Sequence, residues 1–112
     1  MDVFCERIAF SLAQTEHILR AAQEHELGIK VHAEQLSCSG AAELVGRYGG
    51  WSADHLEWVD DRGARAMAAS GMVATLLPGA YYFLRDDHPP DIDLLRRHGV
   101  SMAVASDLNP GS

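Results

Sequence analysis

The sequence predicts an α/β fold built around a parallel sheet. Five short apolar segments alternate with four segments that have the apolar spacing of amphipathic helices. The apolar segments are rich in small and β-branched residues and end in polar residues, as buried parallel strands do. No Pro- or Ser-rich linker and no low-complexity tract separates them, so we expect one structural unit over residues 1–112.

Glycines mark the start of most of the predicted strands. The first strand, 2–6, lies at the beginning of the chain. Each of the other four begins at a glycine, and the strands are 28–35, 50–57, 71–79 and 99–107. Polar residues stand at the carboxyl end of each of these four segments.

Two helices are predicted in the first half of the chain. Ser11 is a helix cap, and Gln14 follows it by three residues, as in a capping box. We expect this helix to end at Gly28 in the left-handed conformation. Apolar residues over 41–48 predict the second helix, which stops at the glycine pair 49–50.

Two further helices are predicted in the second half. Asp60 and Asp61 supply the acidic residues that favour a helix start, and Gly71 closes that helix. The proline pair 89–90 precedes the last helix, and the arginine pair 96–97 lies near its carboxyl end. The order is therefore β-α-β-α-β-α-β-α-β.

Composition argues against several classes of protein. With 9 Lys and Arg against 16 Asp and Glu, the formal charge is −7, which repels phosphate backbones, so we expect no nucleic-acid partner. No apolar run approaches the roughly 18 residues that span a bilayer, and the first residues lack a signal-peptide pattern. Cys5 and Cys38 form no C-x-x-C pair. We therefore expect a cytoplasmic location and no membrane partner.

Three polar residues at predicted strand ends form a candidate site. In parallel α/β folds ligands bind at the carboxyl ends of strands, where His32, His55 and Asp107 stand. Imidazole and carboxylate groups are the ligands of catalytic zinc or iron. The alternative for each histidine is a hydrogen-bonded core residue, and for Asp107 a turn or cap residue. The chain has no G-x-G-x-x-G motif and no G-x-S-x-G motif, which disfavours dinucleotide binding and a serine hydrolase.

Four longer strings occur in order along the chain: His-Ala-Glu-Gln at 32–35, Ser-Ala-Asp-His-Leu-Glu at 52–57, Leu-Leu-Pro-Gly-Ala-Tyr-Tyr-Phe at 76–83 and Asp-Leu-Asn-Pro-Gly-Ser at 107–112. Together they resemble the bacterial imidazolonepropionases of histidine degradation, which belong to the amidohydrolase superfamily of metal-dependent (β/α)8 barrels. The resemblance covers the whole chain. It implies a partial barrel containing about the fourth to eighth strands.

The resemblance also implies a reaction, which is metal-dependent hydrolysis of a cyclic amide C–N bond. It converts the small-molecule substrate 4-imidazolone-5-propanoate to N-formimino-L-glutamate, with one zinc or iron ion, in an enzyme that forms a homodimer at full length. By resemblance, His32 and Asp107 are metal ligands, and His55 activates the metal-bound water or polarises the ring carbonyl. The residues that match substrate or product contacts are Gln35, Asn109, Gly111 and Ser112.

The chain departs from the family in one respect that bears on activity. The family's first strand carries an H-x-H pair of metal ligands, and no H-x-H occurs here. Two expected ligands therefore lie outside this chain, and we expect a carboxyl-side fragment that is inactive alone. Two alternatives are another amidohydrolase, such as a cyclic amidine deaminase or cyclic amidase, and a non-enzymatic α/β module that binds a small acid.

Overall fold

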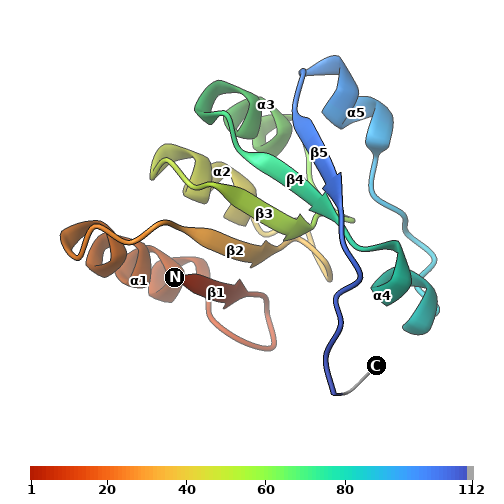
Figure 1. Ribbon diagram of the computed structural model, residues 1–112, viewed down its shortest axis with the longest axis horizontal. Coiled ribbons are helices and arrows are strands. Elements are labelled where there is room, and N and C mark those ends of the chain that lie inside the picture. The colour runs from red at the N-terminus through yellow and green to blue at the C-terminus, as the bar shows by residue number, and fades with distance from the viewer. Residues whose placement is uncertain (111–112) are drawn as a thin grey trace.

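A computed structural model describes residues 1–110 and confirms the predicted α/β fold. Its single sheet has five parallel strands whose spatial order follows the sequence, β1-β2-β3-β4-β5 (Figure 1). A parallel sheet ordered in this way is the arrangement of consecutive units in a (β/α)8 barrel. The strands are β1 (Asp2–Cys5), β2 (Lys30–Ala33), β3 (Ser52–His55), β4 (Val73–Leu76) and β5 (Ser101–Val104).

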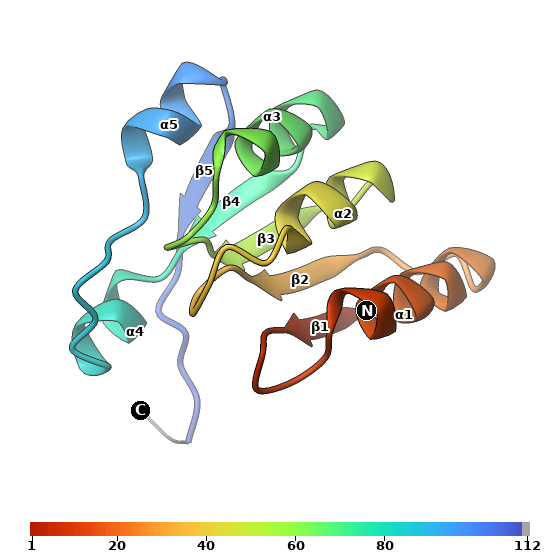
Figure 2. The same cartoon turned by 180° about the vertical axis from the view of Figure 1, so that it is seen from behind.

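The helices that connect the strands form a layer on one face of the sheet. Figure 2 shows α1, α2 and α3 in front of the strands, and α5 continues this layer beside β5. The bounds of the four helices are α1 (Leu12–Glu24), α2 (Ala41–Arg47), α3 (Asp61–Ser70) and α5 (Ile92–Arg97). No helix within residues 1–110 is both long enough and apolar enough to cross a bilayer.

A fifth helix, α4 (Pro78–Phe83), was not predicted. The segment 71–79 was expected to be a strand throughout, but β4 ends at Leu76 and Pro78 takes a first-turn position of α4, where its missing N–H costs no hydrogen bond. The chain after α4 returns toward the sheet, and the His88 ring stacks on Trp58 with centroids 3.6 Å apart. This helix lies at the carboxyl ends of the strands (Figure 1).

Alternating strand residues separate an apolar core from a more polar face. Val3, Val31, Ala53 and Ala74 are buried against the helix layer. Phe4, on the opposite face, is more than one-third exposed. Several core residues are alanines, whose small side chains let the helices approach the strands closely. The helices contribute the buried residues Leu19, Ala22, Ala41, Ala42, Val45, Ala64, Met67 and Leu95.

The predicted helix starts are confirmed at two caps. The Gln14 backbone N–H donates to Ser11 Oγ at 3.2 Å, and the Ser11 N–H donates to Gln14 Oε1 at 2.9 Å, which completes the capping box. Asp60 Oδ1 accepts from the Gly63 N–H at the start of α3. Gly71 closes α3 with a φ of +73°.

The predicted role of Gly28 is wrong. Helix α1 ends four residues earlier, at Glu24, and it is Glu26 that takes the left-handed conformation, with φ at +54°. Gly28 is required for another reason. A Cβ at this position would lie 2.4 Å from the Trp51 ring, so the glycine makes room for the indole at the amino end of the sheet.

The outer strands β1 and β5 form the two edges of the sheet, and we predict that isolated 1–112 self-associates through them. The Ala105 N–H donates to Leu76 O, so by alternation the Val104 N–H points away from β4. Val104→Pro removes this outward donor and should reduce self-association, measured by sedimentation velocity over a range of protein concentrations.

Ala103→Pro is the matched control, because it removes a donor that faces β4 and should destabilise the sheet instead. A parent chain that remains monomeric at every concentration and melts cooperatively would contradict the prediction.

Candidate functional site

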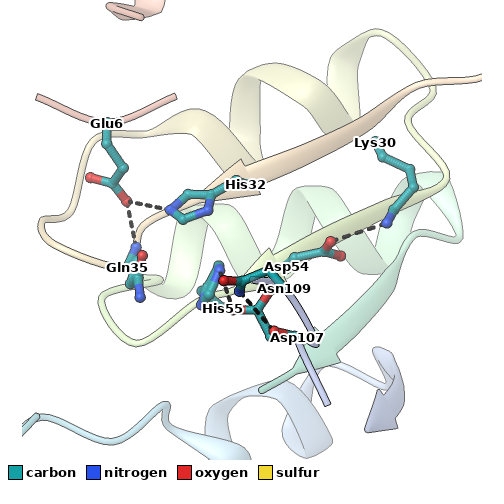
Figure 3. Close-up of polar contacts among 8 residues, drawn as sticks. All are labelled: Glu6, Lys30, His32, Gln35, Asp54, His55, Asp107 and Asn109. Carbon is teal, nitrogen blue, oxygen red and sulfur yellow. Dashed lines mark hydrogen bonds and ion pairs between the residues drawn. The ribbon is translucent and has the colours of Figure 1, made fainter. Parts of the chain in front are cut away.

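The structure brings three predicted site residues together at the carboxyl edge of the sheet. His32 lies in β2, His55 is the last residue of β3, and Asp107 follows β5 (Figure 3). The two imidazole rings have centroids 4.1 Å apart, and His55 Nε2 lies 4.0 Å from Asp107 Oδ2. Residues from two strands and from the segment after a third, separated by 23 to 75 positions in sequence, therefore lie together around His55.

An unusual backbone conformation shapes this edge. His55, Leu56 and Asp107 all have positive φ, at +81°, +68° and +52°. Residues other than glycine rarely adopt this backbone conformation. Simple alternation along β3 would point His55 toward the helices, beside Ala33. The left-handed turn at the strand end instead brings the His55 ring against His32. Strained conformations of this kind persist where the surrounding structure holds them, and they cluster at functional sites.

His32 lies between two other rings. Its centroid is 3.8 Å from that of Phe4 on β1 and 4.1 Å from that of His55 on β3. Burial lowers the pKa of His32 to about 3, the neighbouring His55 adds to this effect, and the Gln35 side chain opposes it. The imidazole is therefore neutral, and its buried Nε2 has no hydrogen-bond partner in the part of the chain described.

His55 is buried more deeply, with 4% of its surface exposed. Burial lowers its pKa, while Asp107 and Asp54 act in the opposite direction. Its Nδ1 is buried and lacks a hydrogen-bond partner among residues 1–110. Asp54 is held by Lys30, whose Nζ lies 3.1 Å from Asp54 Oδ2. A neutral imidazole near two carboxylates can accept a proton and is stabilised once it is charged.

Two buried carboxylates hold the loop that carries Gln35. Glu6, just after β1, accepts from the Gln35 N–H at 2.6 Å and from the Leu36 N–H at 3.2 Å, both on Oε1. Glu34 accepts from the N–H groups of Gly40 and Ala42 at the start of α2. Sequence reasoning did not single out Glu6. Its signal is its position at the end of the first strand, the same position that identified the other candidates.

The remaining candidates lie beyond β5. The Asn109 side chain donates from Nδ2 to the Asp107 carbonyl oxygen at 2.9 Å, and Asn109 is exposed. The segment that carries both residues follows β5 along the carboxyl edge of the sheet (Figure 1). Gly111 and Ser112, also expected to contact substrate or product, lie outside the described residues.

The donor atoms at this edge fit a metal ion in type. The neutral His32 imidazole has a buried nitrogen without a hydrogen-bond partner among residues 1–110, as a metal ligand requires, and Asp107 supplies a carboxylate. Within residues 1–110, no group of three or more His, Cys, Asp or Glu side chains is arranged to hold a metal. The described residues thus supply donor atoms of a suitable type, and by themselves they do not form a metal site.

Comparisons with curated proteins find similar sequences over the whole chain. The imidazolonepropionases of Colwellia psychrerythraea and Burkholderia multivorans are both 60% identical over 112 residues, and that of Burkholderia ambifaria is 58% identical. These matches cover 100% of this chain and 27–28% of the relatives. The chain therefore spans little more than a quarter of the length of the curated relatives it matches. No protein-family model matches the chain.

Two solved structures share the fold. A crystal structure of an amidohydrolase superposes with a TM-score of 0.64 and 22% identity, covering 89% of this chain and 28% of the other. An uncharacterised protein superposes with a TM-score of 0.66 and 20% identity, covering 89% of this chain and 29% of the other. At these identities the likeness supports the fold alone.

We predict that isolated 1–112 binds zinc weakly, because the described residues offer too few gathered ligands. Zinc added to the purified chain should be lost on dialysis against a mild chelator, as measured by elemental analysis. His32→Ala should weaken the remaining binding further, whereas His25→Ala, an exposed residue beyond the end of α1, should not. Stoichiometric zinc retained through dialysis would contradict the prediction.

Proposed function

This chain is similar to imidazolonepropionases over its whole length, and we propose that it forms the carboxyl-side part of the catalytic barrel of such an enzyme. The observation that carries the proposal is the identity of 58–60% over all 112 residues. The gathering of His32, His55 and Asp107 at the carboxyl edge of a parallel sheet supports it, because barrel enzymes place their active sites there.

The proposed reaction is hydrolysis of the ring amide C–N bond of 4-imidazolone-5-propanoate. Water adds to the ring carbonyl carbon, the C–N bond breaks, and the ring nitrogen takes a proton, which gives N-formimino-L-glutamate. The reaction needs a polarised carbonyl, a group that moves a proton, and contacts that orient the substrate.

His32 and Asp107 would hold the metal ion together with ligands from outside this chain. Their chemistry suits zinc or iron, since His32 is neutral and Asp107 offers a carboxylate. When bound, the ion supplies Lewis acidity at the ring carbonyl. The rings of Phe4 and His55 on either side of His32 restrict the orientation of its imidazole.

His55 is the group we assign to proton transfer. Burial disfavours its charged form, so the imidazole is ready to accept a proton from the attacking water. The Asp107 carboxylate, 4.0 Å from Nε2, stabilises the imidazolium that forms. His55 then delivers that proton to the leaving ring nitrogen, which restores the neutral imidazole.

Gln35 and Asn109 are assigned to substrate contacts. Both are amides, which can donate to carboxylate oxygens and accept from ring N–H groups. Gln35 is buried in the loop after β2, beside His32. Gly111 and Ser112 belong to the same proposed set.

The similarity to imidazolonepropionases also supports a wider setting for the enzyme. We infer a small-molecule substrate, a place in histidine degradation, a cytoplasmic location and a homodimeric complete enzyme, with one zinc or iron ion in each active site.

The proposal is tested in a complete enzyme. Residues 1–112 replace the matching segment of the Colwellia psychrerythraea relative, and the chimera is assayed for N-formimino-L-glutamate formation by chromatography. Turnover within about tenfold of the relative is expected, because the exchanged segments are 60% identical. A chimera that folds and binds metal without hydrolysing this substrate would overturn the proposal.

We predict that His55→Ala in the chimera lowers turnover by roughly 10²-fold or more, because it removes the proton-transfer group. Bound metal, measured by elemental analysis, should persist. His25→Ala is the control, because His25 is exposed at the opposite end of the sheet from the site. Unchanged turnover in His55→Ala would remove His55 from the mechanism.

A further inference from the structure

The loop between β2 and α2, residues 34–40, is held at both ends by buried carboxylates. At its far end, Glu34 accepts from the N–H groups of Gly40 and Ala42, which fixes the start of α2. At its near end, Glu6 accepts from the N–H groups of Gln35 and Leu36. Glu6 directly follows the neighbouring strand β1 and lies 29 residues earlier in sequence than Gln35, so this contact is a tertiary one.

Glu6 is itself fixed in place. It is 2% exposed, and the turn that follows it is closed by main-chain bonds from Ala9 N–H to Glu6 O at 2.9 Å and from Phe10 N–H to Phe4 O at 3.1 Å. The backbone that carries the Glu6 side chain is therefore fixed beside the loop. Figure 3 shows this carboxylate directed at the Gln35 backbone and the His32 ring.

The two oxygens of Glu6 have different surroundings. Oε1 accepts both loop N–H groups and lies 3.9 Å from His32 Nε2, which is too far for a hydrogen bond. Oε2 is buried and has no hydrogen-bond partner among residues 1–110. Burying a carboxylate costs free energy unless the carboxylate is hydrogen-bonded. The hydrogen bonds that offset this cost for Glu6 are therefore those from the loop N–H groups to Oε1.

We propose that Glu6 is a positioning residue, which fixes the backbone at Gln35 and Leu36 so that the Gln35 side chain is presented to the substrate. The inference rests on the proposed function, because it takes Gln35 as a substrate contact. Glu6 acts through the reach of its acceptor oxygen, and the charge of the carboxylate is secondary.

Two substitutions separate reach from charge. Glu6→Gln keeps the side-chain length and an oxygen at the position of Oε1. It replaces only Oε2, which has no hydrogen-bond partner among residues 1–110, with the amide NH2 group. Glu6→Asp keeps the charge but is one methylene shorter, so its oxygens no longer reach both N–H groups. Both variants are made in the chimera described above.

The expected results differ between the two variants. Glu6→Asp should raise KM roughly tenfold with a smaller change in kcat, since hydrogen bonds from the loop N–H groups to Oε1 are lost. Exchange of the amides in the peptide covering 33–40 should become at least about tenfold faster, by hydrogen–deuterium exchange mass spectrometry. Glu6→Gln should stay within about twofold of the parent chimera in both measurements.

Amide exchange keeps the test independent of activity. An inactive parent chimera would contradict the proposed function, whereas exchange over 33–40 would still report whether Glu6 holds the loop. Glu24→Asp is the control for shortening a glutamate elsewhere, because Glu24 is exposed at the end of α1 and its shortening should leave exchange at 33–40 unchanged. The proposal is overturned if Glu6→Asp leaves exchange and KM unaltered, or if Glu6→Gln is the more impaired variant.

Discussion

The parallel alignment of the five strands, whose carboxyl ends all lie at one end of the sheet, is the constraint on which the rest of this structure depends. Because the strands follow one another in space as they do in sequence, groups from distant parts of the chain converge at their carboxyl ends. The helices cover one face of the sheet and pack buried alanines against it. These strand ends are therefore buried where they border the core and polar where the chain leaves the sheet, which suits the proposed metal and substrate site.

The patterns that could be predicted from sequence were those set by local chemistry. Strand positions followed from short apolar runs, and the capping box at Ser11 and the closure at Gly71 followed from single residues and their spacing. The helix α4 was not predicted because it has only six residues, and the proline and glycine that begin it are equally typical of a turn. Gly28 was misinterpreted because its reason lies 23 residues away, in the ring of Trp51. Contacts of that kind are not visible in local periodicity.

The candidate site divides in the same way. The strand-end rule identified His32, His55 and Asp107, and the structure places them together. The rule could not give the orientation of His55, which depends on a left-handed turn that alternation does not anticipate. Nor did it reveal how Glu6 supports the neighbouring loop, since that contact joins the residue after β1 to the loop after β2. Sequence thus indicated which groups are present, and the tertiary structure determined which way they face.

The two tryptophans lie in different environments, and this separation has a spectroscopic consequence. Trp51 covers Gly28 at the amino end of the sheet, whereas Trp58 stacks on His88 just beyond the carboxyl end of β3. Each indole is an intrinsic fluorophore whose emission depends on its immediate contacts. Replacing either one by phenylalanine would leave a chain whose remaining tryptophan emission reports on a single end of the sheet, so that loosening of the scaffold and rearrangement beside the site become separate optical signals.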